Sequence, residues 1–144
     1  MHEVYDQVNS SVSMPVLHIA DAAGLAAQTI GVTRLGLLGT EFTMQRRFYR
    51  QRLRDRFDLD VLTPSSAQQA LVHRIIYDAL CCGLINSHSR ESYQEVVTDL
   101  VERGAQAVIL GCTEMGLLIS EDDCSVSIID TTVIHANRAV DEAP

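Results

Sequence analysis

Short, continuous apolar runs alternate with longer amphipathic segments along most of this 144-residue chain. The apolar runs of strand length are VLHI (16–19), RLGLLG (34–39), DVL (60–62), AVIL (107–110) and VSII (126–129). Strands that are apolar on both faces occur in parallel sheets with helices on each side. The pattern therefore predicts an α/β fold with a parallel sheet flanked by helices.

The segments between these runs have helical periodicity and recognisable helix ends. Helices are expected at residues 20–30, 42–56, 66–82, 89–103 and 132–140, with Ser65 or Ser66 capping the third. Gly31, Gly83 and Gly104 follow three of them, as glycine commonly does where a helix ends.

Two of the predicted strands end alike, with LLG before Thr40 and ILG before Cys112 and Thr113. Ligands of open parallel sheets bind beyond the carboxyl ends of the strands. Small residues let the backbone approach a ligand, and hydroxyl groups at a helix N-terminus bind anions. The two strand ends are therefore predicted to bind a small carboxylate between them.

Cys112 is the residue in this pattern that is best suited to a catalytic role. At a strand end before a helix, a thiol pKa can fall below its usual value of about 8.5, which would make Cys112 a base or nucleophile near neutral pH. Glu114 could orient that thiol, and Thr113 could hold a substrate carboxylate. Equally, Cys112 could be a packed core residue, Glu114 a first-turn helix residue, and Thr40 with Thr43 a helix cap.

Composition excludes several other classes of function. The formal net charge of −8 argues against nucleic-acid and anionic-membrane partners. No apolar run approaches the roughly 20 residues of a transmembrane helix. All 11 basic residues counted as Lys and Arg are arginine, so the chain offers no amine for a pyridoxal phosphate Schiff base and no Walker lysine. No GxGxxG dinucleotide fingerprint is present either.

The remaining cysteines, histidines and arginines favour structural interpretations. The four cysteines lack framework spacing, which suits free thiols in a reducing cytoplasm. Cys81 and Cys82 are interpreted as core and surface thiols, and Cys124 as incidental. No metal-ligand spacing links the histidines to the cysteines, so no metal site is expected. Six arginines between residues 46 and 56 are interpreted as a solvated face paired with nearby acids.

Several segments together resemble the aspartate/glutamate racemase family, in particular its aspartate racemase-like branch. They are PVLHIADAAG (15–24), LGLLGTEFTMQRRFYRQRL (35–53), GAQAVILGCTEMGLLI (104–119) and IIDTTVIHA (128–136), and the resemblance covers nearly the whole chain. It implies a cofactor-independent racemase of aspartate or glutamate, built from two flavodoxin-like α/β domains that face each other across a cleft. One cysteine from each domain exchanges a proton with the substrate α-carbon, and such enzymes commonly form homodimers.

The resemblance also implies roles for individual residues. Cys112 matches the second catalytic cysteine, and Glu114 matches its acidic neighbour. Thr40 and Thr113 match contacts to substrate carboxylates, with Thr43 as a further binding residue. His135 matches a recurrent histidine near the cleft or the domain seam.

The family's first cysteine lies in a Cys-Thr-Asn-Thr segment just before the point that matches Met1 and His2. Residues 1–20 are therefore expected to be a remnant of the first domain, residues 21–127 the second domain, and residues 128–144 a return toward the first. With one of the two cysteines, the chain alone is expected to be inactive. It is also expected to expose an apolar strand edge at residues 16–19.

Two other functions stay open at this point. Related folds include hydantoin racemases and maleate isomerase-like enzymes, which also use cysteines at strand ends. Alternatively, the chain could be a non-catalytic fragment that binds a dicarboxylate through Thr40 and Thr113.

Overall fold

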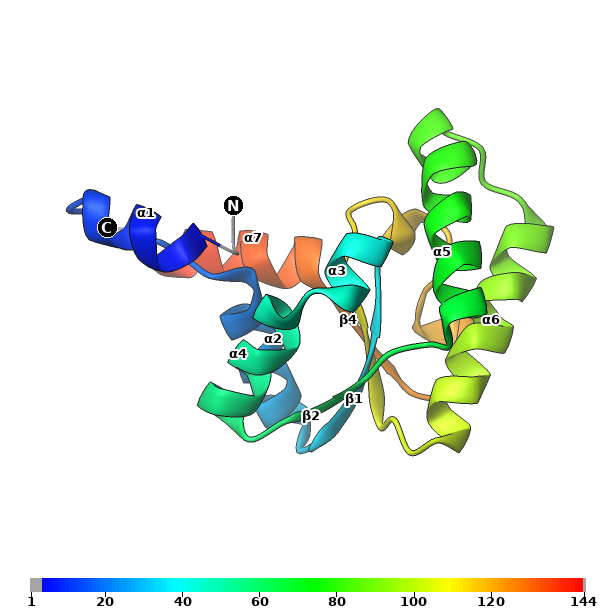
Figure 1. Cartoon of the computed structure of the whole chain (residues 1–144), viewed down its shortest axis with the longest axis horizontal. Helices are drawn as coiled ribbons and strands as arrows, with labels where there is room; N and C mark the ends of the chain where they lie inside the picture. The colour runs from blue at the N-terminus through cyan, green and yellow to red at the C-terminus, as the bar shows by residue number, and fades with distance from the viewer. Residues whose placement is uncertain (1–3, 144) are drawn as a thin grey trace.

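A computed structural model describes residues 4–143 (Figure 1), so Met1 and His2, the point before which the resemblance places the family's first cysteine, lie outside the described residues. The elements are α1 (Tyr5–Ser11), α2 (Ile19–Ile30), β1 (Arg34–Leu38), α3 (Glu41–Gln45), α4 (Arg47–Phe57), β2 (Asp60–Leu62), α5 (Ser66–Asp78), α6 (Ser87–Glu102), β3 (Ala107–Leu110), β4 (Ser127–Asp130) and α7 (Thr131–Asp141). Short 3₁₀ turns lie at Leu80–Cys82, Met115–Leu117 and Glu121–Asp123. None of the helices within residues 4–143 is long and apolar enough to cross a bilayer.

The four strands form one parallel sheet in the order β2-β1-β3-β4, which confirms the predicted α/β fold. Leu38 of β1 is level with Leu110 of β3, and Leu110 is level with Asp130 of β4. Three strands therefore end at the same height, at the upper edge of the sheet in Figure 1. This carboxyl edge carries the segments that contain the predicted site.

Helices cover both faces of the sheet, with α2 and α4 on one side and α5 and α6 on the other (Figure 1). Strand side chains alternate between two cores, as strand geometry requires. Leu35, Leu37 and Ile109 pack with α2 and α4, whereas Val108 and Leu110 pack with α5 and α6. The central strands are therefore buried on both sides, which explains their continuous apolar sequences.

The single helix predicted at residues 42–56 is two helices in the structure. Arg46 leaves the helical conformation, with φ −72° and ψ 142°, and separates α3 from α4. Met44 is buried in the core beneath α5 and α6, whereas Tyr49 and Leu53 are buried in the core beneath α2 and α4. One straight helix cannot bury side chains on opposite faces of a sheet, so the chain bends between them.

The strand predicted at residues 16–19 is wrong, and so is the exposed strand edge expected there. Val16 and Leu17 lie in an irregular segment, and the carbonyl of Val16 accepts a 2.9 Å hydrogen bond from the Tyr5 hydroxyl. His18 is the N-cap of α2, where its Nδ1 accepts the backbone N–H of Ala20 at 3.1 Å. An apolar run of this length fits a strand or a helix start equally well, and the histidine cap selects the helix.

Candidate functional site

The segments that follow β1 and β3 lie side by side because glycine begins each of them. The backbone N–H of Gly111 donates to the carbonyl of Leu38 at 2.8 Å. A Cβ at Gly111 would lie only 2.9 Å from that carbonyl oxygen and 3.2 Å from a methyl group of Thr43, and a Cβ at Gly39 would also lie 3.2 Å from Thr43. A larger residue would force the two strand ends apart. The structure thus brings together the two segments that the sequence singled out.

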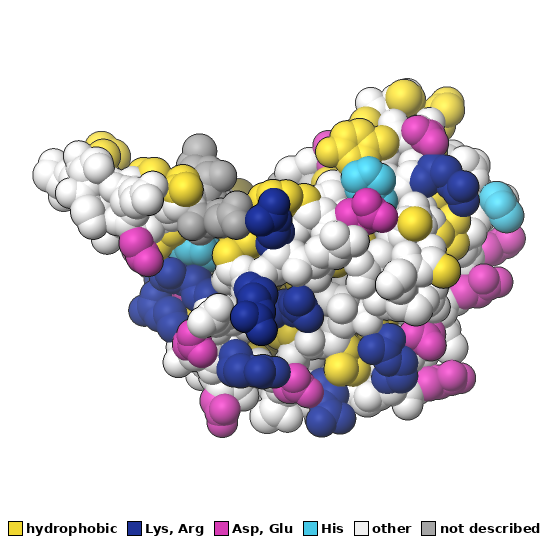
Figure 2. Space-filling model, in the orientation of Figure 1, with side chains coloured by type: hydrophobic (Ala, Val, Ile, Leu, Met, Phe, Trp, Pro, Cys, Tyr) yellow, Lys and Arg dark blue, Asp and Glu magenta, His cyan; other side chains and the backbone are white. Residues whose placement is uncertain are grey.

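The surface above this carboxyl edge is concave. Figure 1 shows α1 and α7 projecting to one side of the edge and the end of α5 rising on the other. In the space-filling view the upper outline dips between these two parts (Figure 2). The carboxyl edge of the sheet, with the segments after β1 and β3, therefore lies between these two parts.

Cys112 follows Gly111 directly and is half-buried. Its Sγ donates a hydrogen bond to Oε2 of Glu114 at 3.0 Å. The other side of Cys112 packs on the core beneath α5 and α6, and its carbonyl accepts the backbone N–H of Met115 at 3.2 Å. Met115 is fully buried, so it anchors the loop that positions the thiol and the carboxylate.

The electrostatic surroundings of Cys112 favour its neutral form. Burial, together with the hydrogen bond to Glu114 and the negative charge of that residue, raises the pKa of Cys112 to about 12. The same hydrogen bond, with another from Thr113, lowers the pKa of Glu114. At pH 7 the Cys112 side chain is then almost entirely the neutral thiol.

The expected fall in the Cys112 pKa is therefore wrong. The prediction assumed that a helix begins after Cys112, because a helix N-terminus stabilises a thiolate. The structure places only the 3₁₀ turn Met115–Leu117 there, and the nearest charged group is the carboxylate of Glu114. The thiolate therefore lacks the expected stabilisation by a helix, and the carboxylate opposes its formation.

Thr40 and Thr43 lie on the neighbouring segment. Thr40 is the N-cap of α3, and its Oγ1 accepts the backbone N–H of Thr43 at 3.4 Å. The two hydroxyl oxygens are 3.3 Å apart, and both residues are half-buried, whereas Thr113 is exposed. The helix-cap interpretation of Thr40 is thus confirmed, and substrate binding by the three threonines stays a prediction.

The junction of β4 and α7 supports the loop that carries Cys112. Thr131 is buried, and its Oγ1 donates to the carbonyl of Leu110 at 2.6 Å. Asp130 caps α7 by accepting backbone N–H groups from the first turn, the shorter at 2.8 Å. A Cβ at Gly116 would collide with the Asp130 carboxylate. His135 lies one turn further along α7 and is half-buried, and its predicted role stays a prediction.

Cys81 was not identified as a site residue from the sequence. Cys81 and Cys82 are both exposed, so the interpretation of one of them as a core thiol is wrong. The Sγ of Cys82 donates back to the carbonyl of Tyr77 at 3.7 Å. Cys81 instead interacts electrostatically with Glu114 and Cys112. The sequence signal was its place at the end of α5, since the helix before it runs toward the carboxyl edge.

His73 is a second residue that the sequence did not single out. Its Nδ1 accepts the backbone N–H of Glu41, the first residue of α3, at 3.2 Å. This contact fixes the start of α3 against α5 and so positions the hydroxyl of Thr40. Among residues 4–143, no three His, Cys, Asp or Glu side chains are placed to hold a metal ion together.

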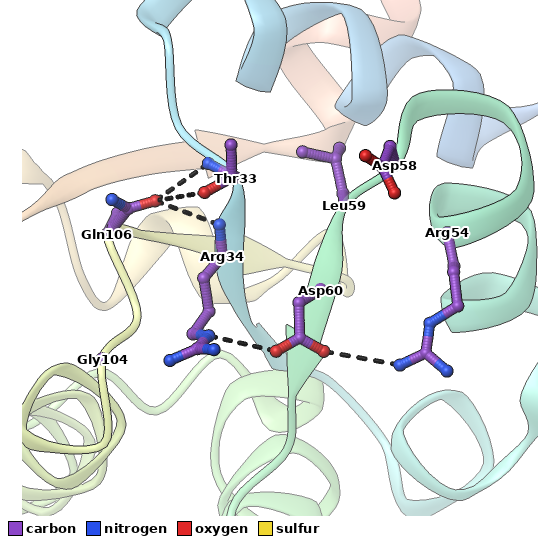
Figure 3. Close-up of a pocket in the computed structure, with 8 residues that line it drawn as sticks. All are labelled: Thr33, Arg34, Arg54, Asp58, Leu59, Asp60, Gly104 and Gln106. Carbon is purple, nitrogen blue, oxygen red and sulfur yellow. Dashed lines mark hydrogen bonds and ion pairs between the residues drawn. The ribbon is translucent and has the colours of Figure 1, made fainter.

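A surface hollow of about 480 Å³ lies at the opposite end of the sheet, by the amino ends of β1 and β2 (Figure 3). Oε1 of Gln106 accepts the backbone N–H groups of Thr33 and Arg34 at 2.8 and 3.0 Å. Asp60 pairs with Arg34 at 3.0 Å and with Arg54 at 3.4 Å. These polar groups satisfy one another, so the hollow is explained by structural contacts and lies far from Cys112.

Comparison with other proteins gives a consistent result. The sequence profile of the Asp/Glu/hydantoin racemase family matches residues 1–139. An uncharacterised protein encoded in the pnlA 3′ region of Pectobacterium carotovorum is 28% identical over 118 residues, which are 82% of this chain and 77% of that protein.

Two crystal structures are similar over almost the whole chain. A candidate Asp/Glu racemase from Yersinia pestis is 43% identical with a TM-score of 0.93, covering 98% of this chain. An aspartate racemase homologue from Pyrococcus horikoshii is 32% identical with a TM-score of 0.89, covering 97% of this chain. The chain spans 61% of the length of each of these structures. With a family profile that covers nearly all of its residues and with this fold, the chain belongs to the Asp/Glu/hydantoin racemase family.

Proposed function

We propose that this chain is part of a cofactor-independent racemase that acts on an acidic amino acid such as aspartate or glutamate. The observation that carries the proposal is the hydrogen-bonded pair of Cys112 and Glu114 at the carboxyl edge of β3, beside the hydroxyls of Thr40 and Thr43. The 32% identity to an aspartate racemase homologue supports the same substrate class. These 144 residues contain no lysine, so no pyridoxal Schiff base can form on this part of the protein.

In this proposal Cys112 is the acid that protonates the substrate. Its raised pKa keeps the S–H bond intact at neutral pH, and the thiol is still a stronger acid than the substrate α-carbon. A base on one face of the α-carbon removes its proton, and Cys112 delivers its own proton to the other face. In the reverse direction the Cys112 thiolate is the base, and its high pKa makes it a strong one.

The opposing base has to lie across the substrate from Cys112. Cys81 shares the same edge of the same sheet, so it does not supply the opposite face. We propose that the second acid/base group comes from residues outside these 144, in keeping with the 61% coverage of the two similar structures. Thr40, Thr43 and Thr113 then bind the substrate carboxylates, and His135 lies toward the domain seam.

The test is α-proton exchange in deuterated water, followed by NMR with L- and D-aspartate and L- and D-glutamate. The protein tested carries the upstream coding sequence restored, with Cys112→Ala and Cys82→Ser compared against it. Exchange should require Cys112 and survive the Cys82 change, because Cys82 is directed back toward α5. Exchange with none of these amino acids, or full exchange by Cys112→Ala, would remove the proposal.

A second function is favoured by the surroundings of Cys112, where burial and the carboxylate of Glu114, 3.0 Å from the thiol, raise the pKa. A chain that holds its thiol neutral and lacks an opposing base can bind a dicarboxylate without exchanging its protons. The 144-residue chain alone should then be thermally stabilised by aspartate or glutamate, and Cys112→Ser should retain this stabilisation. Stabilisation by hydantoins in preference to amino acids would instead assign the site to another substrate class within the family.

A further inference from the structure

The arginine-rich helix α4 has more positive charge than its neighbours neutralise. Three of its arginines bind carboxylates, namely Arg52 and Arg56 with Asp21 and Arg54 with Asp60. Arg47 and Arg50 form no ion pair within residues 4–143. The prediction that this whole run is paired with acids therefore holds for only part of it.

The unpaired arginines line a hollow that is separate from the Cys112 site. Arg47, Arg50 and Arg54 follow one another at helical spacing along α4, and with Val61 of β2 they border a hollow of about 400 Å³. Figure 2 shows the basic side chains gathered over this part of the surface. Asp55 is the one carboxylate among the lining residues, and Arg54 is partly neutralised by its exposed pair with Asp60 (Figure 3).

Two hydrogen-bond donors at this hollow lack an acceptor. Nε of Arg50 is buried and has no hydrogen-bond partner among the described residues, although its Nη2 donates to the carbonyl of Gln45 at 3.4 Å. β2 is an edge strand, and the N–H of Asp60 donates inward to the carbonyl of Thr33 at 2.9 Å. Because backbone groups alternate along a parallel strand, the next N–H, of Val61, is directed toward the open edge. The buried Nε of Arg50 requires an acceptor, and the N–H of Val61 is a second donor at the same hollow.

We propose that this hollow binds a small phosphorylated anion. Guanidinium groups bind phosphate oxygens through pairs of parallel N–H donors, and three arginines can contact a tetrahedral oxyanion from different sides. A planar carboxylate offers two oxygens and satisfies only one such fork. The start of α4 adds to the positive field, since Arg46 provides no side-chain cap and the first turn contains no acid. A long polyanion is disfavoured by the net charge of −8.

The proposal goes beyond the racemase function and is tested without it. Inorganic pyrophosphate is titrated into the 144-residue protein by calorimetry at low ionic strength. Arg50→Gln should weaken binding about tenfold, because it removes a charge-assisted pair of donors. Asp55→Asn should tighten binding about threefold, because it removes the carboxylate that repels the anion. Arg74→Gln is the matched control, since it removes the same charge from an exposed position on α5, across the sheet.

Asp55→Asn keeps the test informative even if Arg50→Gln impairs folding, because a gain of affinity cannot come from unfolding. An equal loss of affinity in Arg74→Gln and Arg50→Gln would show that the net charge of the protein, and not this hollow, determines the affinity, and would overturn the proposal. Citrate binding as tightly as pyrophosphate would overturn the assignment to phosphate chemistry. Absence of saturable binding at millimolar pyrophosphate would overturn the site itself.

Discussion

Glu114 controls how readily the thiol of Cys112 ionises, and replacing it with glutamine tests that control directly. The Glu114→Gln side chain keeps an oxygen that can accept the S–H hydrogen bond but loses the negative charge. Burial of Cys112 is unchanged by the substitution. The pKa of Cys112 should therefore fall while staying above the value of a free thiol.

The magnitude follows from the 3.0 Å separation of Sγ and Oε2. At that distance, with an effective dielectric constant of about 40 to 80 for a half-exposed pair, two unit charges repel by about 1.4 to 2.8 kcal/mol. Each 1.36 kcal/mol corresponds to about one pH unit, so the pKa of Cys112 should fall by about one to two units. Well below both pKa values, the thiolate fraction rises by the same factor, about 10- to 100-fold.

The assay is alkylation of Cys112 by iodoacetamide, followed by intact-protein mass spectrometry between pH 7 and pH 9. Cys81, Cys82 and Cys124 are changed to serine in every variant, so that only Cys112 reacts. The thiolate is the reacting species, so the rate rises with its fraction, but each thiolate becomes a weaker nucleophile as its pKa falls. At pH 8 the Glu114→Gln variant should therefore react about 3- to 15-fold faster than its parent.

Glu95→Gln is the control, because Glu95 is an exposed residue of α6 with the same charge. It should leave the alkylation rate unchanged. If Glu114→Gln reacted no faster than Glu95→Gln, the charge of Glu114 would not be what keeps the thiol protonated. Burial alone would then account for the raised pKa of Cys112.

Substitutions at three further positions test the supports of the fold by thermal and urea unfolding. Thr131→Val leaves the buried carbonyl of Leu110 without its 2.6 Å donor and should cost about 1–2 kcal/mol of stability, whereas Thr131→Ser should restore most of it. Gly24→Ala places a Cβ against the ring of Phe57 and should cost about 1–3 kcal/mol, and an unchanged melting temperature would refute that close packing. Burial opposes ionisation of Asp21, but its two arginine partners outweigh this and lower its pKa. Its ion pairs therefore stabilise the fold above the usual carboxyl pKa and are lost as the pH falls through the lowered value, so Asp21→Asn should cost about 1–2 kcal/mol at pH 7 and progressively less in acid.

The sequence was sufficient to predict the α/β fold class, because a strand that is buried on both faces has a continuous run of apolar residues. RLGLL and AVIL are apolar without interruption, and such runs form the two central strands β1 and β3. The helix ends could also be predicted from local sequence, since Gly31 and Gly83 adopt the left-handed conformation that ends a helix. The two strand ends with their glycines could be recognised for the same reason, and the packing of Gly111 against β1 confirms that they meet.

Tertiary structure decided the properties that depend on distant neighbours. Arg46 breaks the helix because the residues before and after it are buried on opposite faces of the sheet, which no local pattern encodes. The pKa of Cys112 rises first because the fold half-buries its thiol against the core beneath α5 and α6, and the carboxylate of Glu114, two residues along the chain, adds to the effect. Pairing of some arginines of α4 and not others likewise depends on where Asp21 and Asp60 lie in space. Local sequence determines which residues can be buried or can cap a helix, whereas charge and proton affinity depend on every group within a few ångströms, and only the folded chain brings those groups together.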